Sequence, residues 1–469
     1  MTRDRRSSLQ TGAGILAVAT VLRLFVASKL GILDDEAYYW TWSTRLAAGY
    51  FDHPPAIAWI IAFGTALFGK TTLGLRAGGI LLTGIASATL LPLVESPALL
   101  AAILATMPLY ALGGILATPD VPLLAGWMLA TAGLGRFTAD PRARRIVLAG
   151  LGGGLAALGK YTAWGFWPLA IAAALWSRDR RTVLGAVAAA AFALFVTTPN
   201  LLWEAHHDWI SVRFQLHHGL ANTTPPGLGG SLQFLAAQVA LASPVLFVVG
   251  LIAARRAFRA PSGLTRLALA SSLPTLGFFT FAASRSQPEV NWAAPAFVGI
   301  AILLAGPIGV PQTPRITRSA WVGVGVAGSL TALVLVHAFH PFLRIPRDPV
   351  ARLGEGAGMA DSVRAWNEPD IWATRYQEAA LILWYDPTTT LDVTTVPNVD
   401  REDQFDLWRA SGLDGFTPQL FVRPYRSGEK TVIDDGCERG EPNEVDERDG
   451  EGVIVARWQV YEVKGCARP

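Results

Sequence analysis

The chain has 469 residues, of which 51% are hydrophobic and 16% charged, and its mean hydropathy is +0.35. Soluble globular proteins carry about 25% charged residues, so this composition excludes an ordinary soluble enzyme and indicates a membrane protein. The net charge of +3 hides an asymmetry, because residues 1–339 hold 24 Lys/Arg and 12 Asp/Glu, whereas residues 340–469 hold 15 and 24. We therefore predict two domains, a basic transmembrane domain over 1–340 and an acidic, water-soluble exterior domain over 341–469.

The first apolar run, residues 11–30, follows the basic residues Arg3, Arg5 and Arg6 and contains Arg23. Because the run holds an arginine and lacks a small-residue cleavage site, we expect a retained membrane helix and not a signal peptide. Its basic flank predicts that the N-terminus is cytoplasmic. An arginine inside a span is costly, so Arg23 is expected to face other helices and to pair with a polar group.

The later apolar runs predict the topology, since a membrane helix needs about 20 apolar residues. Runs of this kind are 73–94, 97–116, 121–137, 182–200, 231–254, 267–283, 293–310 and 320–339, with two shorter ones at 146–160 and 161–176. The basic loops near Arg142, Arg178, Arg255 and Arg315 all fall on the cytoplasmic side if the short run 56–68 does not cross. We therefore predict an all-α polytopic membrane protein of about eleven transmembrane helices plus juxtamembrane helices, with a small α/β C-terminal domain outside.

This topology places eight of the 12 carboxylates of the membrane domain on the non-cytoplasmic side: Asp34, Asp35, Glu36, Asp52, Asp120, Glu204, Asp208 and Glu289. The densest group is Asp34-Asp35-Glu36, directly after the first span. Repulsion between neighbouring acids raises the pKa of one of them, and a carboxylate with a raised pKa suits general-base catalysis. The alternative is an acidic loop within an ordinary belt of interfacial aromatic residues.

Two further polar positions fall on the same side. Asp120 either caps a helix that starts at Val121 or is a second acid of the same site as Asp35. Lys160 lies at the turn between the two shorter runs, where it either snorkels to the interface or stabilises a departing phosphate. Three arginines on this side are also candidates for the phosphate: Arg76, Arg213 and Arg285.

The segment 203–209 concentrates Glu204, His206, His207 and Asp208. Histidines and acids this close together raise the possibility of a metal site, but their spacing matches none of the strong zinc signatures. Solvated loop residues or contacts to an acceptor are the interpretation that we favour. The sequence shows no required cofactor and no metal ligand set, and it leaves dependence on a divalent metal open.

In combination, the motifs resemble those of the GT-C type glycosyltransferases that use polyprenyl-phosphate sugars, such as the protein O-mannosyltransferases and the lipid A aminoarabinose transferases. The matching segments occur in the family's order across the membrane domain, at Asp35-Glu36-Ala37-Tyr38-Tyr39-Trp40, Tyr50-Phe51-Asp52-His53-Pro54-Pro55, Thr118-Pro119-Asp120, Gly159-Lys160-Tyr161-Thr162, Pro199-Asn200-Leu201-Leu202-Trp203 and Val290-Asn291-Trp292. The segment 375–380 of the tail resembles, less specifically, the small exterior domain of bacterial members.

The resemblance implies an inverting glycosyltransferase that moves a sugar from a polyprenyl-phosphate donor to an acceptor hydroxyl on the non-cytoplasmic face of the cell (inner) membrane. The implied acceptor is lipid A or another glycolipid, a glycan or a protein; no nucleic acid is implied, and membrane lipids surround the enzyme. Asp35 matches the family's first-loop acid and Asp120 its second acid, so the predicted catalytic residues are Asp35, Glu36 and Asp120. The predicted substrate-binding residues are His53, Lys160, Tyr161, Arg285 and Asn291.

Two other classes compete with this interpretation. A multi-span transporter or lipid flippase places its ionisable groups near the midplane, often in inverted repeats, whereas the polar residues here collect in exterior loops. A polysaccharide polymerase or ligase usually carries an arginine-rich exterior loop, whereas residues 201–230 contain Arg213 as their only arginine. The sugar and the acceptor are not marked by any motif.

Both cysteines, Cys437 and Cys466, lie in the tail. If the tail is in an oxidising compartment, we predict a disulfide between them. Because Asp35, Asp120 and Lys160 all belong to the membrane domain, we also expect the tail to be dispensable for the chemistry.

Overall fold

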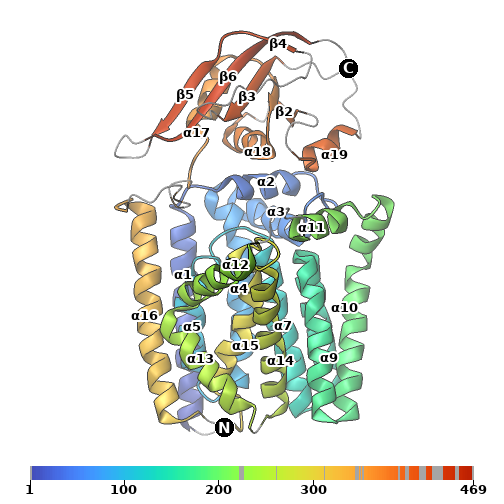
Figure 1. Ribbon diagram of the computed structural model, residues 1–469, viewed down its shortest axis with the longest axis vertical. Helices are drawn as coiled ribbons and strands as arrows, with labels where there is room; N and C mark the ends of the chain where they lie inside the picture. The colour runs from blue at the N-terminus through green and yellow to red at the C-terminus, as the bar shows by residue number, and fades with distance from the viewer. Residues whose placement is uncertain are drawn as a thin grey trace.

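The computed structural model describes residues 3–220, 226–259, 261–310, 312–343, 348, 350, 353–388, 391–396, 401–410, 419–424, 437–448 and 454–466. These residues form a long helical bundle with a small α/β domain at one end (Figure 1). The N-terminus lies at the opposite end of the bundle, and the short helices α2, α3 and α11 lie at the end that faces the α/β domain (Figure 1).

Among the described residues of the membrane domain, the regular elements are helices, joined by turns and loops. Its elements are α1 (Arg3–Ala27), α2 (Asp34–Ser43), α3 (Ala56–Phe68), α4 (Thr72–Leu90), η1 (Leu91–Leu93), α5 (Pro97–Thr106), α6 (Pro108–Ala111), α7 (Asp120–Ala139), α8 (Ala143–Gly159), η2 (Tyr161–Gly165), α9 (Phe166–Ser177), α10 (Arg180–His206), α11 (Ile210–Leu220), α12 (Gly227–Ala242), α13 (Pro244–Ala257), α14 (Gly263–Ala282), η3 (Val290–Ala293), α15 (Ala294–Ala305) and α16 (Pro314–Phe339). Helix α3 lies at the end of the bundle, where the sequence predicts a juxtamembrane helix over 56–68 (Figure 1).

The chain is a multi-pass membrane protein. By length and composition, four described helices could cross a membrane, at Arg5–Ala27, Thr72–Leu93, Arg180–His206 and Pro314–Phe339. The pair α12 and α13 passes the same test together, although it is bent by 100°. The other predicted spans lie on helices that are shorter or less apolar, so length and apolarity alone do not reproduce the predicted count of about eleven.

Two predicted spans are not continuous helices. The run 97–116 is broken after Thr106, because Pro108 has no N–H with which to continue the helix. The run 231–254 is divided at Ser243-Pro244, where Ser243 adopts a positive φ of 73°. Hydropathy counts such segments as single spans because proline and serine at one position barely change the average over a window.

Helices α7 and α8 pack closely because glycines remove side chains at their contact, as in many membrane helix pairs. A Cβ on Gly126 would lie 2.3 Å from the backbone N of Ala156, and a Cβ on Gly133 would lie 2.5 Å from that of Ala149. At the last residue of α8, a Cβ on Gly159 would lie 2.7 Å from the backbone N of Leu123. This close, antiparallel packing brings the start of α7 next to the end of α8.

The C-terminal domain is a mixed sheet with helices. Its elements are α17 (Ala357–Ala365), β1 (Asp370–Ala373), α18 (Tyr376–Tyr385), β2 (Asp392–Thr395), α19 (Gln404–Ala410), β3 (Leu420–Pro424), β4 (Cys437–Arg439), β5 (Asn443–Arg448) and β6 (Ile454–Cys466). The strand order is β2-β1-β3-β6-β4, with β5 also paired to β6. The β1 strand is parallel to β2 and β3, and β6 is antiparallel to its neighbours. The structure thus confirms the predicted small α/β domain.

The pairing of β4 with β6 sets Cys437 opposite Cys466. Cys437 is disulfide-bonded, and Cys466 is the only other cysteine of the chain. The structure therefore agrees with the disulfide that the sequence predicts.

The C-terminal domain packs on α2 and α3. One buried hydrophobic cluster contains Trp42 of α2 and Ile57 of α3 together with Leu381 of α18 and Phe405 of α19. Lys70, which follows α3, donates from Nζ to the carbonyl of Asp386 at 2.6 Å and to that of Leu383 at 3.0 Å, at the C-terminus of α18. The domain is thus fixed to the segment that carries Asp34, Asp35 and Glu36.

Candidate functional site

Three of the predicted site residues meet where α7 begins. Asp120 is the first residue of α7, Lys160 directly follows α8, and Asn291 belongs to η3. Lys160 Nζ donates to Asp120 Oδ1 at 2.9 Å, and Asn291 Nδ2 donates to Asp120 Oδ2 at 2.6 Å. Lys160 Nζ also lies 5.6 Å from the ring centroid of Trp292, within cation–π range. The glycine-mediated packing of α7 on α8 explains why residues 40 apart in sequence form this pair.

The structure does not support the alternative interpretation, in which Asp120 caps the helix. The N-cap residue of α7 is Pro119, and no side chain accepts a capping hydrogen bond there. Both carboxylate oxygens of Asp120 instead accept bonds from Lys160 and Asn291. Asp120 therefore fixes the side chains of Lys160 and Asn291 relative to each other.

Glu36, which is predicted to be catalytic, forms a buried ion pair with Arg76. Its side chain and that of Arg76 are both 0% exposed, with 2.5 Å between Arg76 Nη2 and Glu36 Oε2. Glu36 Oε1 accepts from Arg76 Nε at 2.8 Å and from the backbone N–H of Ala117 at 2.8 Å, and Oε2 accepts from the N–H of Leu33 at 3.1 Å. Both oxygens of the Glu36 carboxylate are thus occupied by groups of the protein, as in a structural anchor, and its catalytic role stays a prediction.

Arg76 is not available for a phosphate either. Besides Glu36, it donates to the carbonyls of Ala27, Leu30 and Gly31, where α1 ends. The pair Glu36–Arg76 thereby joins the end of α1, the start of α2, α4 and the segment that leads into α7. Its role is to fix Asp35 and Asp120 relative to each other.

Asp35 is the exposed acid of the cluster. It lies in the first turn of α2, and its Oδ1 accepts a 3.1 Å hydrogen bond from the hydroxyl of Tyr376, the first residue of α18. Asp34 Oδ1 accepts from the backbone N–H of Asp35 at 3.0 Å. Of the three consecutive acids, Asp35 is the most accessible to solvent, and a residue that accepts a proton from a substrate must be accessible.

Tyr39 connects Asp35 to the group around Asp120. Burial raises the pKa of Tyr39 well above its usual value, and the negative charges of Asp35, Asp52 and Asp120 raise the pKa further. These three carboxylates therefore lie within electrostatic reach of one tyrosine side chain. Asp35 and Asp120 therefore both lie near Tyr39.

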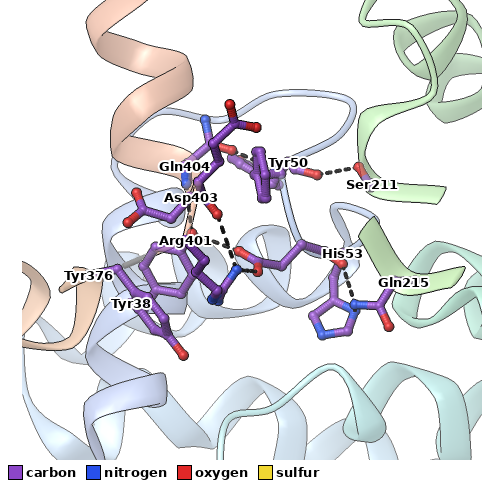
Figure 2. A network of polar contacts seen from close by, with 12 residues as sticks. Tyr38, Tyr50, His53, Ser211, Gln215, Tyr376, Arg401, Asp403 and Gln404 are labelled. Atoms are coloured by element: carbon purple, nitrogen blue, oxygen red, sulfur yellow. Dashed lines mark hydrogen bonds and ion pairs between the residues drawn. The ribbon is translucent and has the colours of Figure 1, made fainter. Parts of the chain in front are cut away.

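The C-terminal domain contributes to this site through Arg401 (Figure 2). Arg401 Nη1 donates to Asp52 Oδ1 at 2.5 Å, and the hydroxyl of Tyr38 donates to Asp52 Oδ2 at 2.7 Å. The Arg401 guanidinium also lies 4.6 Å from the ring centroid of Tyr376 and 4.7 Å from that of Phe214. Asp52 raises the pKa of Arg401, although burial alone would lower it.

Figure 2 shows residues of the tail facing those of the segment between α1 and α3. The backbone N–H of Gln404 donates to the hydroxyl of Tyr38 at 2.8 Å, and Gln404 Oε1 accepts from the backbone N–H of Phe51 at 2.8 Å. With the bond from Tyr376 to Asp35, these contacts join the tail to the segment between α1 and α3, and that the tail is dispensable for the chemistry stays a prediction. The tail forms one wall of the site.

His53 and Tyr161 lie beside the site and are positioned by α10 and α11. Gln215 Nε2 of α11 lies 3.5 Å from His53 Nδ1 and donates to the carbonyl of Asp52 at 2.7 Å. The hydroxyl of Tyr161 donates to Glu204 Oε1 at 2.6 Å. Both are thus held on the side of the site away from α1.

Arg285 follows α14 and is exposed, and its guanidinium lies 5.6 Å from the ring centroid of Phe281. No hydrogen bond among the described residues joins it to Asp120, Lys160 or Asn291. It is not part of the group that the structure brings together.

The histidines at the C-terminus of α10 bond to the helix backbone. His206 Nδ1 lies 2.6 Å from the carbonyl oxygen of Leu202, and His207 Nδ1 lies 2.8 Å from that of Trp203. In the part of the chain that the structure describes, no three His, Cys, Asp or Glu side chains come together as a possible metal site.

An apolar cavity of about 460 Å³ adjoins the polar group. Its lining includes Tyr161, Thr162 and Trp292, and it continues along α9 and α14 past Leu169 and Phe278. The residues next to Lys160 and Asn291 thus border a cavity whose walls are apolar.

Sequence reasoning missed Tyr39, Asp52 and Arg401 as residues of the site. Tyr39 and Asp52 lie inside motifs that the sequence marks, but neither motif distinguishes a reactive group from a packed one. Arg401 is 349 residues from Asp52, and no local pattern links the two.

Comparison with known proteins agrees with this geometry. Residues 52–203 match the family model described as dolichyl-phosphate-mannose-protein mannosyltransferase. The chain is 33% identical over 310 residues to the lipid A galacturonosyltransferase RgtD of Rhizobium johnstonii, in a match that spans 64% of this chain and 64% of that protein.

Solved structures share the fold. ArnT from Cupriavidus metallidurans bound to undecaprenyl phosphate matches 97% of this chain and 98% of its own, with a TM-score of 0.67 and 15% identity. The oligosaccharyltransferase of Archaeoglobus fulgidus in its apo form matches 96% of this chain and 74% of its own, with a TM-score of 0.51 and 12% identity. These findings confirm the resemblance to GT-C type glycosyltransferases that the motifs indicate.

Proposed function

We propose that this chain, which has the GT-C fold of ArnT, is an inverting glycosyltransferase that uses a polyprenyl-phosphate sugar. The observation that carries the proposal is the Asp120–Lys160 pair, which lies next to an apolar cavity and, with the exposed acid Asp35, near Tyr39. A base, a cation and an apolar cavity are the three features that transfer from a lipid phosphate requires.

In the proposed reaction, Asp35 accepts the proton of the acceptor hydroxyl as its oxygen attacks the anomeric carbon of the donor. The new C–O bond forms as the bond between the anomeric carbon and the phosphate oxygen breaks, and that electron pair leaves with polyprenyl phosphate. A single displacement of this kind inverts the anomeric configuration.

Lys160 is proposed to stabilise the negative charge that develops on the phosphate. Asp120 and Asn291 act on this step by fixing Lys160 through the 2.9 Å and 2.6 Å contacts at Asp120. The apolar cavity of about 460 Å³ is large enough for part of an isoprenoid chain, which supports binding of the donor lipid along α9 and α14. His53 and Tyr161 border the space for the sugar, and Glu36 acts as a positioning residue.

Undecaprenyl phosphate, which ArnT binds, and lipid A, on which RgtD acts, are the donor carrier and the acceptor that we propose to test first. We further propose that the site faces the non-cytoplasmic side of the cell (inner) membrane, with the N-terminus in the cytoplasm. No cofactor is proposed, and a chelator in the assay tests dependence on a divalent metal.

The transporter alternative is not favoured. Transporters bind their substrates near the midplane of the bundle, whereas the described polar groups of this site lie at the end of the bundle that carries the C-terminal domain (Figure 1).

The test uses the purified full chain in lipid nanodiscs, with lipid A and a panel of undecaprenyl-phosphate sugars that includes galacturonic acid. The expected result is stoichiometric release of undecaprenyl phosphate and a glycosylated lipid A, both measured by mass spectrometry, with the anomeric configuration inverted. Release of undecaprenyl phosphate with no glycolipid, or a product of retained configuration, would contradict the proposal.

A further inference from the structure

A second groove lies between α1, the broken helix α5–α6 and α16. Its volume is about 490 Å³, and Arg23 is its one charged lining residue. The rest of the lining is apolar or small, and Val18 and Leu22 of α1 are 60% and 57% exposed, so the groove opens to the lipid. Arg23 itself is only 9% exposed.

Part of the reason why an arginine occurs at position 23 of α1 is structural. Within α5–α6, the carbonyl of Leu104 would accept from the N–H of the residue four positions later, but that residue is Pro108, which has none. Arg23 Nη2 donates to this carbonyl at 2.9 Å, and Thr331 of α16 donates to the carbonyl of Thr106 at 2.8 Å. Both bonds satisfy backbone groups that lipid could not satisfy.

One hydrogen bond does not account for a charged residue at this position. A neutral glutamine could make the same bond, whereas an arginine in a span is costly unless its charge is balanced. Among the described residues, no carboxylate forms an ion pair with Arg23. The guanidinium therefore brings an uncompensated positive charge and unused N–H donors to a groove that is otherwise apolar.

The position of Arg23 along α1 indicates what would balance it. It lies four residues before Ala27, the end of α1, which corresponds to about 6 Å along the helix. This end of α1 is the one that faces the C-terminal domain (Figure 1), so Arg23 can reach the level of the lipid head groups. A basic group above an apolar groove between membrane helices suits a lipid phosphate with its acyl chain below.

We propose that this groove binds an anionic glycerophospholipid, with its phosphate at Arg23 and an acyl chain along the exposed face of α1. The site is separate from the proposed donor cavity, which is lined by α7, α9, α14 and α15. Glycosyl transfer is not part of its test, so the two proposals can fail independently.

The test measures binding of phosphatidylglycerol and phosphatidylcholine to the purified full chain in detergent by native mass spectrometry. The wild type should retain one phosphatidylglycerol in preference to phosphatidylcholine. Arg23→Gln keeps a donor for Leu104 but removes the charge, and should weaken phosphatidylglycerol binding about tenfold while leaving phosphatidylcholine unchanged.

A second variant tests the groove without touching the charge. Gly14 lines the groove, and a Cβ on it would meet nothing within 4 Å, so Gly14→Leu should fold normally and exclude both lipids. Gly325→Leu is the matched control, because Gly325 on α16 has equal space and does not line the groove. Equal binding of the two phospholipids by the wild type, an unchanged preference in Arg23→Gln, or selective binding of undecaprenyl phosphate there instead would overturn the proposal.

Discussion

At the residue scale, two neighbouring acids have opposite roles. Asp35 is exposed and accepts a hydrogen bond from Tyr376, whereas Glu36 is fully buried against Arg76. One step along a helix turns the side chain by about 100°, so consecutive residues face different surroundings. Both residues belong to the same acidic motif, so the sequence cannot distinguish them. The difference comes from Arg76, which is 40 residues away in sequence and pairs with Glu36 alone of the two.

Glu36→Gln is expected to destabilise the protein by about 3–5 kcal/mol, because it leaves the Arg76 guanidinium buried without its counter-charge. The measurement is thermal unfolding in detergent, with Asp34→Asn as the matched control. If the two variants unfold at the same temperature, Glu36 is not the anchor that its contacts indicate.

Asp403 gives a residue-level prediction on pH. Burial, followed by the nearby charge of Asp406, raises the pKa of Asp403 from 3.8 to about 7. A raised pKa means that the folded state holds this proton more tightly than the unfolded state, so stability is full below about pH 4 and is lost as the pH rises to about 7. The loss is at most about 4 kcal/mol.

Asp403→Asn should therefore stabilise the C-terminal domain at pH 8 and change it little at pH 4. Asparagine can still accept the 2.7 Å bond from the backbone N–H of Phe405 at the start of α19. Melting curves at the two pH values check this, and a variant that is less stable than the wild type at pH 8 would refute it.

At the scale of elements, two short segments of the tail contact the site. Tyr376 at the start of α18 bonds Asp35, and Arg401, just before α19, pairs with Asp52. Arg401 contacts Asp52, which also accepts a bond from Tyr38, so we expect it to act as a positioning residue for the segment between α1 and α3.

Arg401→Ala should lower the rate of transfer about tenfold or more, because Asp52 is left buried without its partner. Arg401→Lys should restore part of the rate, since lysine keeps the charge. Arg364→Ala is the control, because Arg364 pairs with Asp361 on an exposed face of α17 in the same domain. Equal rates for Arg401→Ala and Arg364→Ala would show that the tail does not shape the site.

The sequence predicts the helical hairpin that brings Asp120 and Lys160 together. Asp120 directly precedes the apolar run 121–137 and Lys160 ends the run 146–160, and the number of membrane crossings predicted between them puts both residues on the same side of the membrane. It does not predict the breaks at Pro108 and Ser243, which hydropathy averages conceal. It also does not predict the contact of Arg401 with Asp52, since that contact depends on how the tail folds back over α2. Local signals therefore identify the membrane half of the site, and tertiary packing supplies the rest.

At the scale of the whole molecule, the orientation in the membrane is open to a direct test. The loop after α2 and the start of α8 are expected on opposite sides, outside and inside. Leu46→Cys, at a position 60% exposed, should react with an impermeant thiol reagent in intact cells, and Arg144→Cys only after permeabilisation. The wild-type chain is the background control, because Cys437 is disulfide-bonded. The reverse labelling would place the site in the cytoplasm.

The most direct test of the proposed chemistry is single-turnover release of undecaprenyl phosphate by the wild type, Asp35→Asn and Asp34→Asn. Asp35→Asn keeps the shape of the side chain and removes the base, so it should still bind the donor while its rate falls by about 10²–10⁴. Asp34→Asn, which changes a neighbouring acid of the same motif, should stay close to the wild type. A wild-type rate for Asp35→Asn, or a larger loss in Asp34→Asn, would contradict the assignment of Asp35 as the base.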